Sequence, residues 1–414
     1  MPEAVIVATA RSPIGRAVKG SLKDLRPDDL AATIIDAVLT KVPQLDRTLI
    51  EDLYLGCGLP GGEQGFNMAR VVATQLGLDG LPGATVTRYC SSSLQTTRMA
   101  FHAIKAGEGD IFLSAGVETV SRFARGSSDG LPPELRAQVG GGWENPKFGD
   151  ARSRTKKFAE GGQTWHDPRE DDLLPDVYIA MGQTAENLAQ VKGVSREEMD
   201  EFGVRSQNLA EKAIADGFWQ REITPVTLPD GTVVSADDGP RPGVTIEGVS
   251  QLKPVFRPDG RVTAGNCCPL NDGAAAVVVM SDTKARELGI TPLARIVSTG
   301  VTALSPEIMG LGPVEASKQA LKRAGMTIGD VDLVEINEAF AAQVIPSYQD
   351  LGIPIDKLNV NGGAIAVGHP FGMTGARLTG TLLNSLDWHD KSIGLETMCV
   401  GGGQGMAMIL ERLS

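Results

Sequence analysis

A cysteine lies where two predicted elements of the chain meet. The apolar run 84–89 before Cys90 is typical of a strand, and the pattern 91–101 after it is typical of a helix. The first backbone N–H groups of a helix have no partners inside it, and the helix dipole is positive at that end. Both effects favour the thiolate, so the sequence predicts that Cys90 is a nucleophile. The alternative is a cysteine that serves only as a small buried hydrophobic residue.

One of the four histidines lies in a glycine-rich loop. Glycines surround His369 throughout 362–377, where they allow the backbone to approach a ligand, and Pro370 restricts the chain directly after it. A histidine placed in this way is a candidate general base, with a structural role as the alternative. Roles in the core or at the surface suffice for the other three, which are His102, His166 and His389.

A second thiol, Cys399, precedes a run of glycines that begins at Gly401. Consecutive glycines after a thiol can point backbone N–H groups at a developing oxyanion. A phosphate-binding loop is the competing interpretation, but no Lys-Ser/Thr pair follows and 406–410 has the pattern of a strand. Together with Cys90 and His369, this segment predicts carbon chemistry on a thioester.

An amide side chain follows the predicted strand 333–336. Asn337 stands where α/β sheets present groups to a ligand, and a carboxamide there can orient a water molecule or a carbonyl. The alternative is a helix N-cap.

Composition narrows the class of protein. The chain has 414 residues, 42% of them hydrophobic and 22% charged, as in ordinary globular enzymes. A net charge of −12 argues against nucleic acid as a partner. Five cysteines without a C-x-x-C pair fit neither a disulfide scaffold nor a zinc site, and no stretch reaches membrane-spanning length. With no secretion signal and no peroxisomal tail, we expect a cytoplasmic protein without a bound metal.

Strand-length apolar runs alternate with amphipathic helical stretches, which indicates an α/β fold. The order helix, loop, strand in 30–55 recurs in 314–336, and this indicates an internal duplication. Residues 122–250 have a more polar, loop-like texture. We therefore expect an N-terminal half, an insertion and a C-terminal half. Their predicted bounds are 1–121 completed by 251–290, then 122–250, then 291–414.

Four segments resemble the signature blocks of the thiolases, the acetyl-CoA acyltransferases. In chain order these are the corner at Cys90, Asn337-Glu338-Ala339-Phe340, Gly368-His369-Pro370 with Gly375 and Arg377, and the run from Cys399 to Gly405. The blocks stand in family order, and the resemblance extends over 4–411. It implies two duplicated α/β halves with five-stranded mixed sheets in a layered α-β-α-β-α core, plus a large loop domain inserted in the N-terminal half.

The resemblance also implies roles for the site residues. Cys90 is the acylated nucleophile, and His369 takes its proton. Cys399 is the acid and base that protonates the acetyl-CoA carbanion in cleavage or generates it in condensation. Two oxyanion holes are implied, one from His369 and a water held by Asn337, the other from the backbone N–H groups of Cys90 and Gly401.

Coenzyme A is the implied co-substrate, with no permanently bound cofactor. Basic residues within 152–157 or 196–221 are expected near its phosphate. Cys268 stands where the family often has a serine along the pantetheine, and Met181 and Phe371 are further expected substrate contacts. Ala180 before Met181 replaces a histidine that short-chain biosynthetic members tend to have, and this favours longer or bulkier acyl groups.

The resemblance predicts a 3-ketoacyl-CoA thiolase of fatty-acid β-oxidation. Thiolytic cleavage would yield acetyl-CoA and an acyl-CoA two carbons shorter. The first alternative is a biosynthetic acetyl-CoA acetyltransferase that makes acetoacetyl-CoA. The distant alternative is a non-catalytic acyl-CoA carrier or scaffold subunit. The expected partners are acyl-CoA and CoA, a second copy of the chain in a homodimer or homotetramer, and other β-oxidation enzymes, with no membrane insertion.

Overall fold

The computed structural model describes residues 2–123, 125 and 144–414. Nine strands follow one another in a single mixed sheet of order β10-β11-β12-β9-β1-β8-β5-β3-β4, and a short β2 pairs with β8. The strands are β1 (Ala4–Arg11), β2 (Gly15–Arg16), β3 (Asp52–Gly56), β4 (Gly83–Val86), β5 (Ile111–Thr119), β8 (Asn271–Ser281), β9 (Ala294–Ala303), β10 (Leu333–Ile336), β11 (Ile393–Val400) and β12 (Gln404–Arg412). The structure therefore confirms the α/β fold predicted from the alternating strands and helices of the sequence.

The sheet consists of two copies of one arrangement. In the first copy β3 pairs parallel with β5, and β5-β8-β1 continue antiparallel. In the second copy β10 pairs parallel with β11, and β11-β12-β9 continue antiparallel. The copies meet where two residues of β1 pair with two of β9. This repeated topology confirms the predicted duplication.

The fifth strand of the second copy is reduced to one bridge. Where β4 pairs with β3 over four positions, Leu358 alone bridges Val334 in the parallel sense. The next residue, Asn359, has φ of 44°, and its side chain accepts from the N–H of Ile336 at 2.8 Å and donates to its carbonyl at 2.9 Å. The amide thus replaces the backbone ladder at this edge, so the second half has four regular strands where five were expected.

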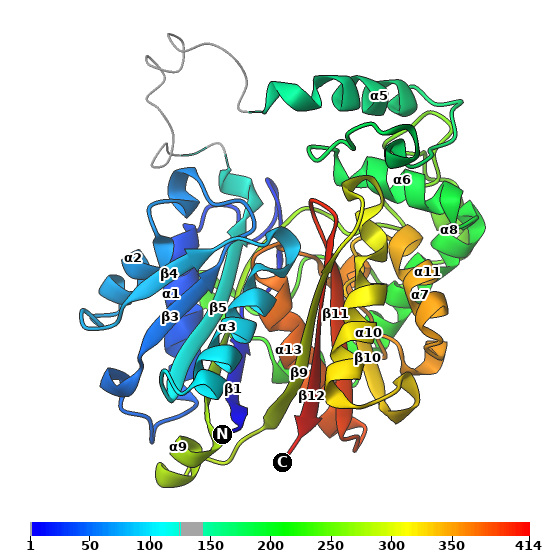
Figure 1. Ribbon diagram of the computed structural model, residues 1–414. Helices are drawn as coiled ribbons and strands as arrows, with labels where there is room; N and C mark the ends of the chain where they lie inside the picture. The colour runs from blue at the N-terminus through cyan, green and yellow to red at the C-terminus, as the bar shows by residue number, and fades with distance from the viewer. Residues whose placement is uncertain (1, 124, 126–143) are drawn as a thin grey trace.

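Helices form three layers around the two halves of the sheet (Figure 1). The main helices are α1 (Pro27–Thr40), α2 (Met68–Gln75), α3 (Ser92–Ala106), α9 (Asp282–Glu287), α10 (Gly312–Ala324), α11 (Ala341–Leu351), α12 (Ala364–Val367) and α13 (Thr374–Trp388). Helices α1 and α2 cover the outer face of the first half, and α10 and α11 cover that of the second. Helices α3 and α13 lie between the halves and pack against each other, with α3 on strands of the first half and α13 on strands of both. This is the five-layer core implied by the family resemblance.

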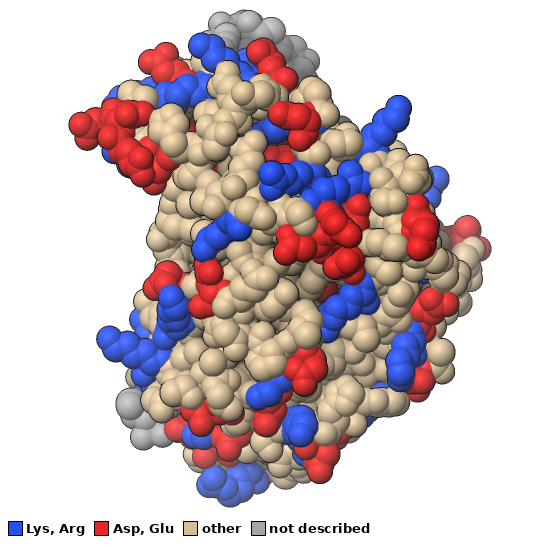
Figure 2. All heavy atoms as spheres, turned by 90° about the vertical axis from the view of Figure 1, so that its right-hand side faces the viewer, with Lys and Arg blue, Asp and Glu red and all other residues tan. Residues whose placement is uncertain are grey.

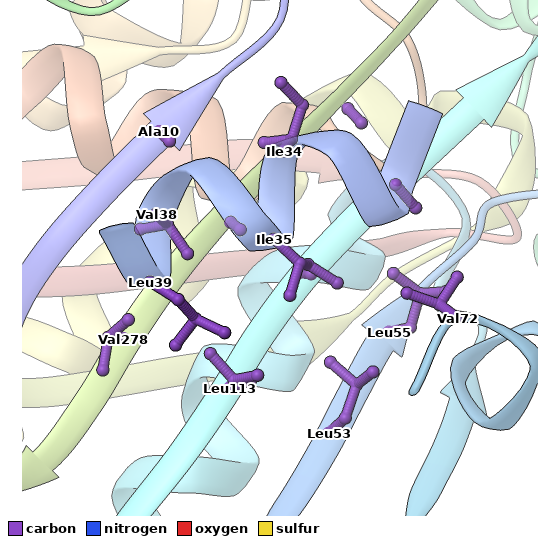
Figure 3. Packing of buried hydrophobic residues seen from close by; sticks show 14 of the residues in the cluster. Ala10, Ile34, Ile35, Val38, Leu39, Leu53, Leu55, Val72, Leu113 and Val278 are labelled. Carbon is purple, nitrogen blue, oxygen red and sulfur yellow. The ribbon is translucent and has the colours of Figure 1, made fainter. Parts of the chain in front are cut away.

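Apolar side chains on one face of α1 illustrate how the outer layer is held. Pro27 begins the helix, and Ile35 and Leu39 are directed at the strands that carry Leu113 and Val278 (Figure 3). Proline suits the first turn because its missing N–H has no helical partner there. Burying an aliphatic side chain of this size contributes about 1.5–3 kcal/mol.

The insertion packs mainly on the second half. Its described elements are α5 (Gly149–Ala159), α6 (Met181–Val191), α7 (Arg196–Ala215), α8 (Ile246–Ser250), β6 (Val226–Thr227) and β7 (Val233–Val234). Its glycine-rich part, 126–143, lies outside the described residues. Glu307, buried in the second half, accepts from Trp165 Nε1 at 2.5 Å and from the N–H of Asp176 at 2.7 Å. These bonds fix the segment that leads into α6.

Charged side chains are interspersed on the face over α10, α11 and α7 (Figure 2). Neither sign forms an extended block on this face. Within the described ranges, no helix combines the length and the apolar character that crossing a membrane requires.

Candidate active site

Cys90 lies in a tight corner between β4 and α3. A short 3-10 turn, Tyr89–Ser91, joins the two elements, and Tyr89 has a positive φ of 44°. The hydroxyl of Ser92 accepts from the N–H of Arg88 at 2.9 Å and donates to the carbonyl of Tyr89 at 2.7 Å. These bonds hold a backbone conformation that few L-residues adopt, and so they fix the direction of the Cys90 side chain.

Burial decides the ionisation of this thiol. Cys90 is 6% exposed, and burial raises its pKa to about 12. The backbone N–H of Gly401 donates to the sulfur and opposes the shift, whereas the carboxylate of Glu118 adds to it. The thiolate expected from the helix end alone is therefore not the resting form, because desolvation of the charged sulfur has the larger effect.

His369 is placed by the loop between α12 and α13. Gly368 before it has φ of 112°, and a Cβ at Gly368 would lie 2.6 Å from Ile14 and 2.8 Å from Asn271. The N–H of His369 donates to Oδ1 of Asn271 at 2.9 Å, and α13 begins shortly afterwards. Glycine is thus required here for both its backbone angle and its small size.

The hydrogen bonds of the imidazole assign its proton. Thr374 Oγ1 donates to the carbonyl of Pro370 at 2.7 Å, so it accepts from Nδ1–H of His369 at 2.6 Å. Nε2 is then an acceptor, and Asn337 Nδ2 lies 3.3 Å from it. Burial, and next the charge of Arg377, lower the pKa of His369 to about 3. The ring is therefore neutral and able to take a proton at Nε2.

Asn337 directly follows β10 and faces the imidazole. Its N–H donates to the carbonyl of Thr397 at 3.0 Å, and its own carbonyl accepts from Gln343 Nε2 at 2.8 Å. Its side-chain Oδ1 is buried and has no hydrogen-bond partner among the described residues. An oxygen in that position is suited to accept from a water or ligand group.

The second thiol comes from the end of β11. Cys399 is fully buried, and burial together with the nearby Cys90 raises the pKa of its thiol. The tight connection from β11 to β12 requires positive φ at Gly402, 76°, and Gly403, 79°. This turn directs the N–H of Gly401 at the sulfur of Cys90. The structure thus brings both predicted cysteines and the predicted backbone donor together.

Two cavities are lined by cysteines. The smaller, about 220 Å³, is lined by Cys90, Met181, Phe371 and Gly401 together with apolar residues. The larger, about 370 Å³, is lined by Cys267 and Cys268. Burial and the neighbouring thiols of Cys267, Cys90 and Cys399 raise the pKa of Cys268, which places it beside the same centre. His369 reaches the smaller cavity through Phe371, whose ring lies edge to face with the imidazole at 5.3 Å.

Three cations line the larger cavity. Arg16, Lys19 and Arg241 line it, whereas no Lys or Arg from 152–157 or 196–221 is among its lining residues. In those ranges Arg152 pairs with Glu144, and Arg205 donates to two backbone carbonyls. Arg16 and Lys19 come from the N-terminal half, and Arg241 comes from the insertion but from outside those two ranges.

Thr374 is a site residue that the sequence analysis misses. Its place five residues after His369 gives no pattern that distinguishes it from any threonine in a helix.

Within the described ranges, no group of three or more His, Cys, Asp or Glu side chains is arranged to hold a metal ion.

The arrangement suits acyl transfer through sulfur. A buried thiol faces a backbone N–H donor, a neutral imidazole is oriented as an acceptor, and a second protonated thiol lies within electrostatic reach. A thiol attacks a carbonyl well and leaves readily, which allows a covalent acyl intermediate. Backbone donors are suited to stabilise the oxyanion of such a step.

Comparisons with known proteins identify the family of this chain. The family description "Thiolase, N-terminal domain" matches residues 4–283, and "Thiolase, C-terminal domain" matches 290–412. A 3-ketoacyl-CoA thiolase of Bacillus subtilis is 41% identical over 99% of this chain and 100% of that protein. One of Cronobacter sakazakii is 42% identical over 100% of both chains.

Solved structures show the same fold. The acetyl-CoA acetyltransferase of Bacillus anthracis superposes with a TM-score of 0.85 at 36% identity, covering 100% of this chain and 99% of that one. The dimeric peroxisomal thiolase of Saccharomyces cerevisiae superposes with a TM-score of 0.85 at 34% identity, covering 100% and 98%. With two family descriptions covering nearly the whole chain, and full-length relatives at more than 40% identity, this protein belongs to the thiolase family of acyltransferases.

Proposed function

We propose that this protein is a 3-ketoacyl-CoA thiolase, which cleaves 3-ketoacyl-CoA with CoA to give acetyl-CoA and an acyl-CoA two carbons shorter. The observation that carries the proposal is that the thiols of Cys90 and Cys399 interact beside a cavity lined by Cys90 and Phe371, with the imidazole of His369 packed on Phe371. The relatives at 41–42% identity that bear this name support it.

In the first half of the reaction, Nε2 of His369 takes the Cys90 proton as the sulfur attacks the 3-keto carbon. The bond between C2 and C3 then breaks, and the carbanion of acetyl-CoA takes the proton of Cys399. The shortened acyl group remains on Cys90 as a thioester. The raised pKa of Cys399 suits this step, because the thiol keeps its proton until a strong base forms beside it.

In the second half, the thiol of incoming CoA gives its proton to the Cys399 thiolate and attacks the thioester. The Cys90 sulfur leaves and recovers its proton from His369, so the enzyme returns to its starting state. The N–H groups of Cys90 and Gly401 would stabilise one oxyanion, and His369 with a water on Asn337 the other. The donor position of Gly401 and the open Oδ1 of Asn337 support these assignments.

The two cavities divide the substrate between them. The larger cavity, with Arg16, Lys19 and Arg241, would hold CoA, because three cations suit phosphate groups and Cys268 leads inward to the thiols. The smaller cavity, lined by Leu59, Val177, Tyr178 and Ile179, would hold the acyl chain. A dry cavity of about 150 Å³ accepts benzene, so a cavity of about 220 Å³ has room for an acyl chain longer than that of acetoacetyl-CoA.

The competing function is acetoacetyl-CoA synthesis, which the fold likeness to an acetyl-CoA acetyltransferase supports. Turnover of a series from acetoacetyl-CoA to 3-ketohexadecanoyl-CoA distinguishes the two. The proposal predicts a higher kcat/KM for medium chains than for acetoacetyl-CoA. Activity confined to acetoacetyl-CoA would favour the acetyltransferase.

A Cys399→Ala variant tests the division of labour between the thiols. It should still exchange an acyl group between Cys90 and an acyl-CoA, because exchange breaks no carbon–carbon bond and the proton that His369 takes from Cys90 can pass directly to the departing CoA thiolate. It should lose carbon–carbon cleavage by a factor of roughly 10²–10⁴, the usual contribution of general acid catalysis. Equal loss of both reactions would show that the role assigned to Cys399 is wrong.

The cellular location, pathway and oligomeric state of the enzyme are also part of the proposal. All five cysteines are free, which supports a reducing, cytoplasmic location, and the substrate class supports a place in fatty-acid β-oxidation beside the enzymes that make 3-ketoacyl-CoA. A dimeric relative of the same fold supports a homodimer or a homotetramer. Sedimentation would show at least twice the chain mass of 43.6 kDa, and a monomer would contradict this part.

A further inference from the structure

A buried carboxylate lies beside the thiol site without taking part in the chemistry described above. Glu118, near the end of β5, is 0% exposed. Its oxygens accept from the backbone N–H groups of Gly58 at 2.7 Å, Leu59 at 3.3 Å and Gly372 at 2.8 Å, and from Gln64 Nε2 at 2.8 Å. The thiol of Cys57 is a fifth partner, with its Sγ 3.8 Å from Oε1. Burial raises the pKa of Glu118, and the four N–H groups oppose that shift because they bond the lone pairs of the carboxylate.

The donors come from two segments that line the acyl cavity. Gly58 and Leu59 follow β3 and line that cavity together with Cys90. Gly372 follows Phe371, which lines the same cavity and packs against the imidazole of His369 at 5.3 Å. One carboxylate therefore connects a wall of the cavity with the loop that carries the general base.

These segments are packed too closely to move independently. A Cβ at Gly58 would lie 2.7 Å from Oε2 of Glu118 and 2.7 Å from Cβ of Phe371. A Cβ at Gly372 would lie 2.3 Å from the carbonyl of Val117, the residue before Glu118. The hydrogen bonds of Glu118 and the close contacts of Gly58 and Gly372 thus occur at one place, where the end of β5 touches the segment after β3 and the loop after His369.

We propose that Glu118 is a positioning residue, whose carboxylate fixes the segment of Gly58 and Leu59 relative to that of Phe371 and Gly372 and so aligns His369 and the acyl cavity with Cys90. The proposal rests on the thiolase function in that the aligned step is acyl transfer to Cys90. A shift of about 1 Å in such an alignment can cost on the order of 10²-fold in rate.

The charge of Glu118 supplies a second, independent signature. Among the described residues, the titratable groups near Cys90 are Glu118, the thiols of Cys268 and Cys399, and the imidazole of His369 across Phe371. The thiol of Cys57 faces Glu118 itself. Of these, the Glu118 carboxylate contributes to the raised pKa of Cys90 by repelling the thiolate. Removing that charge while keeping the shape of the side chain should lower the pKa of the thiol.

The test is Glu118→Gln, measured in two ways on the full-length protein. The amide turns one acceptor oxygen into a donor, so we expect kcat for a medium-chain 3-ketoacyl-CoA to fall roughly 10- to 100-fold. We also expect the rate of Cys90 alkylation by iodoacetamide to rise at a lower pH than in the wild type. The second result would not follow from a role in folding alone.

Glu396→Gln is the matched control, because Glu396 is equally buried on β11, in the other half of the sheet, and bonds Thr379. It should leave kcat within twofold of wild type and should not shift the pH midpoint of Cys90 alkylation. A folded Glu118→Gln variant with wild-type kcat, or with an unchanged alkylation midpoint, would overturn the proposal.

A second variant covers the case in which Glu118→Gln does not fold. Gln64→Leu removes one donor to the carboxylate, together with the acceptor of the Thr119 N–H, and leaves the bonds from Gly58 and Gly372. It is expected to fold and to lower kcat several-fold, and wild-type kcat in this variant would also contradict the proposal. If the wild type cleaved no 3-ketoacyl-CoA, the proposed function would be wrong. The alkylation profiles would still show whether the charge of Glu118 raises the pKa of Cys90.

Discussion

Burial acts in opposite directions on the two residues that exchange a proton. It raises the pKa of Cys90 to about 12 and lowers that of His369 to about 3. Both groups therefore rest uncharged near neutral pH. The proton should move to Nε2 only as the sulfur attacks, when the negative charge passes to an oxygen held by the N–H of Gly401.

The sequence predicts which residues meet but not how they ionise. Spacing and neighbouring glycines identify Cys90, His369 and Cys399, because those features are local. The protonation of Cys90 depends instead on desolvation by segments far along the chain, including the turn at Gly401. For the same reason Thr374 and Glu118 escape notice, since their partners are determined by the tertiary fold.

Replacing Thr374 with valine tests how the imidazole is oriented. Thr374→Val keeps the shape but leaves Nδ1–H of His369 without its acceptor, so Nε2 is no longer held as the proton acceptor. We expect kcat to fall about tenfold or more, and the free energy of unfolding to fall by about 1–3 kcal/mol. Enzyme assays and urea denaturation measure the two effects.

Thr379→Val is the control for this change. Thr379 lies on the same helix, and its hydroxyl bonds Glu396 at 2.9 Å, away from the imidazole. It should lose stability while keeping kcat. Full activity in Thr374→Val would show that its hydroxyl does not orient His369.

At the level of elements, two helices start from the two catalytic corners and pack against each other. Helix α3 begins directly after the turn of Cys90, and α13 begins after the loop of His369. A Cβ at Gly375, in the first turn of α13, would lie 2.3 Å from the backbone nitrogen of Leu94. The close approach of these helices therefore determines how far apart the two corners lie.

Gly375→Ala should force the two helices apart. We expect a loss of about 1–3 kcal/mol in the free energy of unfolding from overpacking, together with a lower kcat. Gly380→Ala, on the same helix, is the control, because its Cβ would lie 3.4 Å from Oγ1 and 3.6 Å from Cβ of Thr9, which are ordinary contacts. That change should be neutral or stabilise by about 0.5–1 kcal/mol. Equal behaviour of the two variants in denaturation and turnover would contradict this account.

Two adjacent strands also carry a pair of buried glutamates. Glu335 of β10 and Glu396 of β11 are partners in the parallel register, and burial raises the pKa of each to about 8. A folded-state pKa above the unfolded value of about 4.3 means that the folded protein binds the proton more tightly. This contribution to stability is complete below about pH 4.3 and is lost as the pH rises through about 8.

Glu396→Gln removes one of these titrating groups. The free energy of unfolding of the variant, relative to wild type, should therefore increase between pH 5 and pH 9, by at least about 1 kcal/mol. Urea denaturation at several pH values measures the difference. The same pH dependence in both proteins would show that Glu396 stays ionised in the folded state.

Strand and helix runs of the core are predictable because their apolar patterns are long and regular. The edge of the second half is not, since Asn359 replaces the regular pairing of a fifth strand through its side chain. No local pattern distinguishes an asparagine that bonds a neighbouring strand from one in an ordinary turn.

At the level of the whole molecule, the insertion completes the cavity that the two halves leave open. Its segment from Val177 to Met181 forms one wall, while Cys90 and Phe371 belong to the halves. Glu307 holds this wall through Trp165 and Asp176. The sequence predicts an insertion from its composition, but the anchor lies far along the chain and has no local signature.

Replacing Glu307 with alanine should loosen that wall. Glu307→Ala leaves two buried N–H groups without acceptors, so we expect KM for medium-chain 3-ketoacyl-CoA to rise several-fold and stability to fall by about 1–3 kcal/mol. Alkylation of Cys90 by a small reagent should change little, because the core is intact. Glu315→Ala, at an exposed position on α10, is the control and should match wild type. An unchanged KM in Glu307→Ala would contradict the assigned anchor.

The most direct test of the account is the mass of the protein after mixing with 3-ketooctanoyl-CoA in the absence of free CoA. The account predicts a hexanoyl group on the peptide that contains Cys90, its release on addition of CoA, and no such adduct in Cys90→Ser. Turnover without an adduct, or with the acyl group on another residue, would contradict it.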